Sequence, residues 1–306
     1  MAAPDAPNNE QTVSAAATPS APSGLKRRWW LNIGLLAVIA LLAALVIQQT
    51  DQDKKPAGPA LSAIVAANIS QIRIEKNEQA PIVLEKIANE WRLTAPLPAR
   101  ANPFNVDSLL KIISASTETR FAAVAADLAN YGLDKPAARV RYNNDEIIFG
   151  ALHPLKSQVY VMYKNEIALI PAFYLASPNY PYTNFISSRL FEEDRKLTML
   201  KLPNFTLALS NGAWSRQPLD QKLSTDRLND FAAEWQNARA LSVEKYSGKA
   251  AIGEIEISST RDAKNEKLSL GILAYKPDFI LHRSDENLEY HFTEETGKRL
   301  LNISLQ

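Results

Sequence analysis

The residues that could do chemistry in this chain are few and scattered. The three histidines, His153, His282 and His291, form no H-E-x-x-H motif, and Glu289 adds no spacing typical of metal ligands. If their segments are strands, a two-residue period lets His282 and His291 face each other across a hairpin. We interpret them as strand histidines with a structural role, and we expect no metal site.

No pattern for nucleophilic catalysis or phosphate binding is present in the sequence. There is no G-x-S-x-G element, and the ten glycines form neither a G-x-G-x-x-G run nor a Walker loop. The acidic clusters Glu192-Glu193-Asp194 and Asp285-Glu286 would need a cleft and unequal environments to act as general acid and base. We interpret them as solvated loop charges, and we expect no catalytic residue and no cofactor.

Aromatic residues concentrate in one segment, residues 173–185, which holds five aromatic side chains and two prolines. Rings on a rigid loop offer a large contact area at a low entropic cost. We consider two interpretations: the rings pack two domains against each other, or they form a ledge for a partner or a glycan. The candidate contact residues are Tyr174, Tyr180, Tyr182 and Phe185.

The elements that must position these residues form two similar series. Alternating apolar and polar residues predict strands. In the first series the predicted strands are residues 69–76, 82–84, 90–93, 138–142, 146–149, 158–163 and 166–170. In the second they are residues 205–209, 212–216, 254–257, 267–270, 279–282 and 289–292. An amphipathic helix interrupts each series, with Asn105 and Ser224 as predicted N-caps, and closing helices are predicted at residues 171–176 and 293–301.

The two series keep a nearly constant offset. It is 123 residues between Trp91 and Trp214, 119 between the two predicted N-caps, and 121 between Gly150 and Gly271. An offset that persists across strands, a cap and a glycine indicates a tandem duplication. Runs of strands interrupted by one helix predict an α+β fold with antiparallel sheets.

An apolar stretch, residues 29–47, precedes the first series and contains no charged residue. As a helix it would measure about 28 Å, close to the hydrocarbon core of a bilayer. Lys26, Arg27 and Arg28 stand directly before it, which places the N-terminus in the cytoplasm by the positive-inside rule. A cleaved signal peptide is a weaker alternative because no A-x-A site follows, and a buried core helix is a second one.

We therefore predict a single N-terminal transmembrane helix followed by two tandem related domains of antiparallel sheet plus helix. The chain would sit in a bacterial inner membrane and contact the lipid bilayer through residues 29–47, with its bulk in the periplasm. The predicted divisions are a disordered tail at 1–25, the anchor at 26–48, a linker at 49–60, and α+β repeats at 61–194 and 195–306.

Charge and cysteine content exclude several classes of protein. The chain has 34 Lys and Arg against 33 Asp and Glu, so it predicts no dominant basic face for nucleic acid. It has no cysteine, which excludes disulfides, c-type haem attachment and Cys-ligated metal sites.

Four motifs carry a resemblance to a known bacterial family, the domain of unknown function numbered 4340, over roughly residues 69–300. They are Trp91-Arg-Leu93 with Pro96, the segment Tyr131-Gly132-Leu133-Asp134-Lys-Pro136, Ile147-Ile-Phe-Gly150, and Gln158-Val-Tyr-Val161. The second series has Tyr246-Ser-Gly248-Lys in place of the tyrosine–glycine–leucine element. The resemblance implies an envelope-associated protein, in some cases found beside ABC-transporter components, and it brings no catalytic residue.

Three hypotheses about function remain at this point. The first is a membrane-anchored, periplasmic, non-catalytic binding or scaffold protein, accessory to an envelope or ABC-transporter-type complex. The second is a carboxylate-dependent hydrolase or transferase acting on an envelope polymer. The third is a ligand-sensing receptor domain, which would need a partner to carry the signal.

Overall fold

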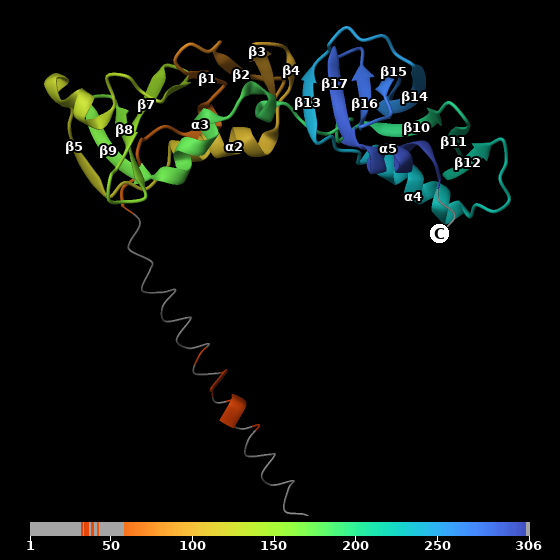
Figure 1. Ribbon diagram of the computed structural model, residues 1–306, viewed down its shortest axis with the longest axis horizontal. Coiled ribbons are helices and arrows are strands. Elements are labelled where there is room, and N and C mark those ends of the chain that lie inside the picture. Colours follow the sequence, from red (N-terminus) through yellow and green to blue (C-terminus); the bar gives the residue numbers. More distant parts are fainter. Residues whose placement is uncertain (1–31, 33, 37, 40–41, 43–57, 304–306) are drawn as a thin grey trace, which may run out of the picture. The chain divides into compact units, whose positions relative to one another are not determined.

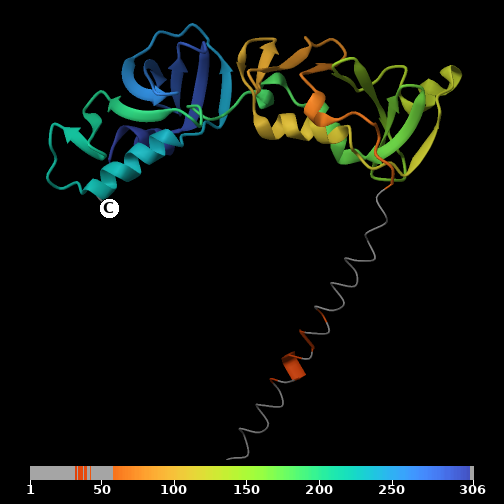
Figure 2. The same ribbon diagram turned by 180° about the vertical axis from the view of Figure 1, so that it is seen from behind.

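The structure, a computed structural model, describes residues 32, 34–36, 38–39, 42 and 58–303. From Gly58 onward the described chain folds into one unit that contains two antiparallel sheets. Figures 1 and 2 show the same unit from opposite sides. Each sheet carries a layer of helices on one face, with α2 and α3 under the first and α4 and α5 under the second.

The predicted fold class needs a correction at its N-terminal element. Among the described residues, no helix is long and apolar enough to cross a membrane. The described chain consists instead of two antiparallel sheets with few helices. The prediction rests on the hydropathy of a continuous stretch, of which only residues 32, 34–36, 38–39 and 42 belong to the described chain. Most of the predicted anchor, the tail at 1–25 and most of the linker at 49–60 lie outside the described residues.

The first sheet is a meander in which one strand closes the far edge. Its strands follow the alternation of the sequence, as in β1, where Ile72 and Ile74 are buried between half-buried polar neighbours. In spatial order it contains β4 (Ala99–Arg100), β3 (Glu90–Ala95), β2 (Ile82–Ile87), β1 (Gln71–Glu75), β6 (Ala138–Tyr142), β7 (Asp145–Leu152), β8 (Gln158–Tyr163), β9 (Glu166–Pro171) and β5 (Thr119–Ala122).

The second sheet has the same strand order, except that no described strand corresponds to β4. In spatial order it contains β12 (Ala213–Gln217), β11 (Thr206–Ser210), β10 (Lys196–Lys201), β14 (Gly253–Arg261), β15 (Lys264–Ala274), β16 (Asp278–Arg283), β17 (Leu288–Thr293) and β13 (Ser242–Lys245). This agreement is what a tandem duplication would produce. The duplication and its boundaries at residues 61–194 and 195–306 stay predictions.

The helices start where the backbone chemistry is most favourable. α2 (Pro103–Ile112) begins earlier than predicted because Pro103 suits the first helical position, and Asn102 caps it by accepting from Phe104 N–H at 3.1 Å. The prediction of Asn105 as the N-cap is therefore wrong. Ser224 is confirmed as the cap of α4 (Thr225–Gln236). The other helices are α3 (Ala176–Asn179), α5 (Glu294–Leu301), and the 3-10 segments η1 (Ala66–Asn68), η2 (Ala125–Tyr131), η3 (Ala172–Leu175) and η4 (Tyr182–Phe185).

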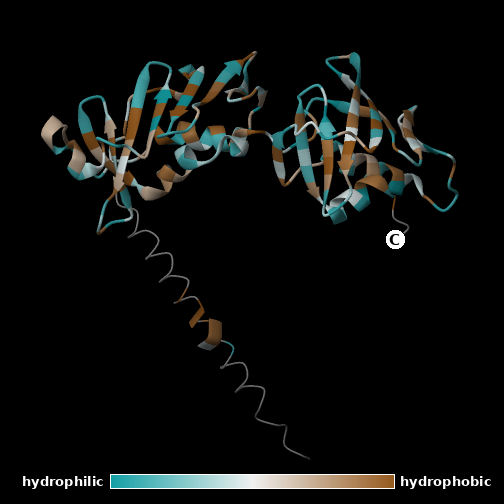
Figure 3. Cartoon of the chain, turned by 45° about the horizontal axis from the view of Figure 1, so that its top comes forward, coloured by the Kyte–Doolittle hydropathy of each residue, from teal (hydrophilic) through white to brown (hydrophobic). Residues whose placement is uncertain are grey.

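The larger of two hydrophobic clusters in the described chain contains buried residues of both sheets and of the helices. Apolar and polar residues alternate along the strands, as the colours of Figure 3 show. Tyr142 and Trp235 are completely buried, and each satisfies its polar atom: Tyr142 donates to Leu109 O at 2.6 Å and Trp235 to Leu300 O at 2.7 Å.

The tyrosine–glycine–leucine element covers the outer face of the first sheet. Gly132 ends η2 with φ of 65°, a conformation that glycine adopts without steric cost. The chain then lays Leu133 and the Tyr131 carbonyl directly over Gly150 of β7, where a Cβ atom would collide with that carbonyl. Leu133, Ile148 and Ile167 form a small second core on this face.

The segment between the two sheets, residues 185–190, is hydrogen-bonded on both sides. It bridges to the end of the first sheet through Ala101 and Ile186, and to the second through Arg189 and Arg239. The two sheets are therefore joined edge to edge through this connecting segment. Its hydrogen bonds are Asn102 N–H to Phe185 O (2.8 Å), Ser187 N–H to Arg100 O (2.8 Å), Ala240 N–H to Ser188 O (2.8 Å) and Leu190 N–H to Ala238 O (2.9 Å).

Candidate functional site

Three arginines with little exposure to solvent lie where the two sheets meet. Arg283 of β16 is 1% exposed, Arg195 lies just before β10, and Arg100 comes from β4 of the first sheet. A guanidinium cannot lose its proton in a protein, so each must find anionic or carbonyl partners when it is removed from water.

Arg100 connects the first sheet to β17 of the second. Its Nε donates to Glu286 Oε1 at 2.5 Å, and its Nη2 donates to Arg189 O at 2.6 Å and to the Tyr290 hydroxyl at 2.9 Å. The Tyr290 hydroxyl in turn donates to Glu286. One side chain therefore links β4, the connecting segment and the second sheet.

Glu192 accepts hydrogen bonds from the other two arginines, Arg195 and Arg283. Its Oε2 accepts from Arg195 Nε at 2.6 Å, and its Oε1 accepts from Arg283 Nη2 at 2.8 Å and lies 3.8 Å from Arg100 Nε. Burial favours the neutral carboxyl, but the charges of Arg283 and Arg100 and the hydrogen bond from Arg195 outweigh it. They hold the pKa of Glu192 well below its usual range.

We name this set the junction network: Arg100, Glu192, Arg195, Arg283, Glu286 and Tyr290. Burial raises the pKa of Tyr290, so its hydroxyl stays protonated and able to donate at neutral pH. The network is satisfied by its own members, by Asp285, Glu266 and the Ser259 hydroxyl, and by main-chain carbonyls. One such carbonyl is Leu190 O, which accepts from Arg283 Nη1 at 2.6 Å. It is built to hold the two sheets together.

A pocket of about 440 Å³ opens beside the junction network, and we name it the junction pocket. Half-buried Trp91 of β3 and buried Phe191 give it apolar walls. Its lining residues are Asn89, Glu90, Trp91, Arg100, Ala101, Pro103, Ser187, Arg189, Phe191, Glu192, Glu193 and Asp194. This size falls within the range of small-molecule sites.

The four predicted aromatic contact residues pack inward. Phe185 is 0% exposed and belongs to the core, and Tyr174, Tyr180 and Tyr182 are half-buried against it. Tyr180 lies over Phe185 with 6.5 Å between ring centroids. Phe185 therefore anchors the connecting segment at its first residue, and a role of these rings in partner binding stays a prediction.

The histidines of the second sheet lie on one face of a hairpin. His282 pairs with Glu289 in the β16–β17 register, so His291 is its diagonal neighbour. Tyr246 stacks on His282 with 3.7 Å between centroids, and Glu289 accepts from the Ser247 N–H and hydroxyl at 2.7 and 2.6 Å. Among the described residues, no group of three or more His, Cys, Asp or Glu side chains could hold a metal ion.

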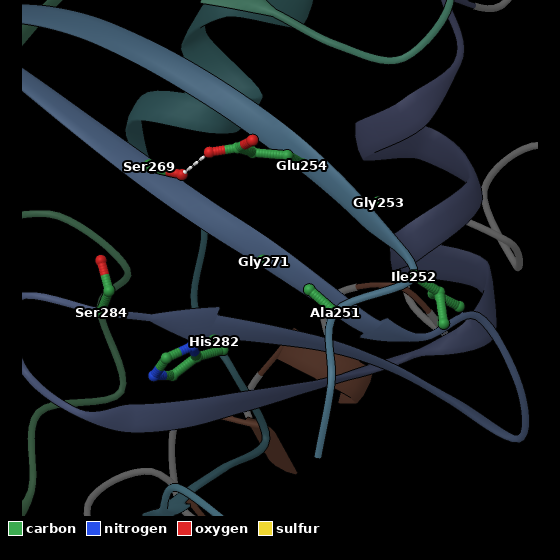
Figure 4. Close-up of a pocket in the computed structure, with 8 residues that line it drawn as sticks. All are labelled: Ala251, Ile252, Gly253, Glu254, Ser269, Gly271, His282 and Ser284. Carbon is green, nitrogen blue, oxygen red and sulfur yellow. Dashed lines mark hydrogen bonds between the residues drawn. The ribbon is translucent and has the colours of Figure 1, made fainter. Parts of the chain in front are cut away.

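A second pocket, of about 570 Å³, lies on this face over Gly271. In Figure 4 the Ser269 hydroxyl donates a hydrogen bond to Glu254 on one side of the pocket. The His282 ring lies on the other side and points away from that pair. The polar side chains therefore do not converge on one point. Burial lowers the pKa of His282 and keeps its ring neutral at neutral pH.

Sequence reasoning missed the junction network. The interpretation of both acidic clusters as solvated loop charges is wrong for Glu192 and Glu286, whose side chains are only 11% and 12% exposed, and it is correct for Glu193 at 79%. Neighbouring carboxylates in one loop look alike in a sequence. The only available signal was the position of both clusters next to an arginine at a strand end, Arg195 and Arg283.

The fold and the junction define a class of protein: two antiparallel sheets joined edge to edge, with an ion network and an open pocket at the joint. The family model described as "Domain of unknown function (DUF4340)" matches residues 91–271. The chain belongs to this family, as its sequence motifs predict. The match runs from Trp91 to Gly271 and so contains the connecting segment and parts of both sheets. No curated protein and no solved structure matches the chain.

Proposed function

We propose that this protein is a non-catalytic binding or scaffold protein, accessory to a larger envelope complex, that works as a rigid two-sheet platform. The observation that supports this most is the joint between the sheets. A segment hydrogen-bonded on both sides and a buried ion network hold two separate sheets in one arrangement. A partner would therefore meet a preformed surface and would lose little conformational entropy on binding.

The alternative of a carboxylate-dependent hydrolase finds less support at this site. Such an enzyme needs a carboxyl group whose pKa is raised so that it can donate a proton. Glu192, a buried carboxylate that lines the junction pocket, has a lowered pKa and is bound to arginines. It is therefore suited to holding arginines and not to protonating a leaving group.

The cellular location stays a prediction. The periplasmic placement and the contact of residues 29–47 with lipid come from the sequence alone, and the proposal of an envelope partner depends on them. The absence of cysteine makes a direct test available, because a single introduced thiol is the only one in the chain.

The first experiment places this thiol at the junction in intact cells. Glu193→Cys, at a side chain 79% exposed beside the pocket, is labelled with a membrane-impermeant maleimide that carries a photo-crosslinker. We expect labelling without cell lysis and capture of one defined envelope protein. Lys222→Cys, at an exposed loop position beyond β12, is the matched control.

The comparison between the two positions decides the result. Capture of the same protein from position 193 but not from position 222 supports a partner at the junction. Labelling only after lysis contradicts the periplasmic location, and equal capture at both positions, or capture at neither, contradicts the proposed platform.

A further inference from the structure

The junction pocket has a composition that points to one kind of ligand. Its lining residues come from the edge of the first sheet, from the connecting segment and from residues 191–194. Arg261 of β14 contacts two of the lining residues, because its Nε donates to Asp194 at 2.7 Å and its Nη2 lies 3.7 Å from Glu90. The pocket therefore exists only where the two sheets are joined.

The charged groups that line the pocket are already neutralised within the described chain. Arg189 binds Glu193 at 2.6 Å, Asp194 binds Arg261, and Arg100 binds Glu286. Glu192 is held by its arginines, and Glu90 lies 3.3 Å from Arg92. An ionic ligand would compete with these pairs, whereas an uncharged ligand would leave them intact.

Uncharged hydrogen-bonding groups and an aromatic surface remain. The indole N–H of Trp91 has no partner among the described residues, in contrast to that of buried Trp235. Asn89 contributes an amide at the turn before β3, and buried Ser187 contributes a hydroxyl whose oxygen also accepts from Arg189 N–H at 3.4 Å. An aromatic wall surrounded by mixed donors and acceptors suits a ligand that is apolar on its ring faces and carries hydroxyls around its edge.

We propose that the junction pocket binds a neutral saccharide of one to three rings, with one sugar ring against Trp91. The inference deepens the binding function proposed above and rests on it. It assigns the pocket to a glycan, so that a rigid platform would hold a polysaccharide segment between its two sheets.

The second sheet provides an internal control. Trp214 occupies the position on β12 that Trp91 occupies on β3, and both are half-buried against the core. β12 is the edge strand of its sheet, whereas β4 and the connecting segment continue beyond β3. The same substitution at both tryptophans therefore separates loss of binding from loss of core packing.

The test measures binding of maltotriose, cellotriose and tri-N-acetylchitotriose to the full chain by isothermal titration calorimetry. We expect at least one of them to bind, Trp91→Leu to weaken that binding about tenfold, and Trp214→Leu to leave it unchanged. Asn89→Gly removes the amide while tolerating the φ of 68° at this turn, and it should weaken binding without lowering stability. Inorganic phosphate and spermidine serve as charged probes and should not bind.

Binding of none of the three saccharides, equal loss in both tryptophan variants, or tighter binding of phosphate or spermidine would each overturn the inference. If no saccharide binds but position 193 still captures one envelope protein, the saccharide proposal is wrong and the proposed platform function stands. If a saccharide binds but no protein is captured, the proposal of a protein partner is contradicted and the proposal of a saccharide ligand stands.

Discussion

At the scale of single residues, the arginines at the junction link the connecting segment, the first sheet and the second sheet. Arg283 and Arg100 are almost completely removed from water, which is favourable only when geometry and hydrogen bonding compensate for the lost hydration. The planar guanidinium provides several fixed donors, and carboxylates and main-chain carbonyls receive them. Such a network penalises any arrangement of the sheets that leaves one charge without its partner.

Substitutions of the neighbouring residues Glu192 and Glu193 test how much the junction network contributes to the free energy of unfolding. Glu192→Gln removes the charge shared by three buried arginines, and we expect it to lower the free energy of unfolding by about 3 kcal/mol. Glu193→Gln, which affects an exposed ion pair, should change it by less than about 0.5 kcal/mol. Urea denaturation monitored by tryptophan fluorescence measures both.

The pH dependence of this difference identifies its origin. The pKa of Glu192 is lowered in the folded chain, so its contribution is complete above the unfolded-state pKa of about 4.3 and is lost as the pH falls toward the native pKa. The gap between the wild type and Glu192→Gln should therefore narrow from about pH 5 downward. A gap that stays constant down to about pH 3 would mean that the variant acts through packing and not through charge.

At the scale of elements, the outer face of each sheet is covered by a different segment. The first sheet is covered by η2 and by Tyr131 to Leu133, which press on Gly150. In the second sheet a Cβ atom added to the corresponding Gly271 would meet only the Ala251 methyl closely, at 3.1 Å. On this face the pocket of Figure 4 lies over Gly271, with Ala251 among its lining residues.

The two glycines predict different tolerance to a methyl group. Gly150→Ala would collide with the Tyr131 carbonyl and should lower the free energy of unfolding by about 2 kcal/mol. Gly271→Ala needs only a small shift of a side-chain methyl, and we expect a change below about 1 kcal/mol. Thermal or urea unfolding of both variants tests this, and an equal loss would show that the tyrosine–glycine–leucine segment does not lie firmly on the first sheet.

At the scale of the whole molecule, the joint makes one folding unit of two sheets. The hydrophobic core runs from one sheet into the other, and the connecting segment contributes Phe185, Ile186 and Leu190 to it. Separate domains on a flexible linker would unfold independently, whereas a shared core couples their unfolding.

We therefore expect one cooperative transition in scanning calorimetry of the protein. Ala240→Pro removes the N–H that donates to Ser188 O at 2.8 Å and should separate this transition into two. Two transitions in the unmodified protein would contradict the coupling. One unshifted transition in the variant would show that the ladder at this position is dispensable.

Most of the strands, the helix α4 with its cap and the family were predictable from local patterns, whereas β4, β5, β10 and β13 were not predicted. Alternation along Gln71–Glu75, the serine before Thr225–Gln236 and the motif at Tyr131 to Pro136 each follow from interactions within a few residues. The predicted cap of α2 is misplaced because two asparagines compete, and Pro103 decides between them.

The sequence alone determined most of the antiparallel strands and the family to which the chain belongs. The tertiary structure decided which carboxylates are buried, that the aromatic rings turn inward, and that a pocket opens beside Trp91. The physical reason is range: alternation and capping act between neighbours in the chain, whereas Arg100 and Glu286 are 186 residues apart and meet only when both sheets have formed. The burial of these side chains and the pairing of their charges therefore depend on the tertiary structure.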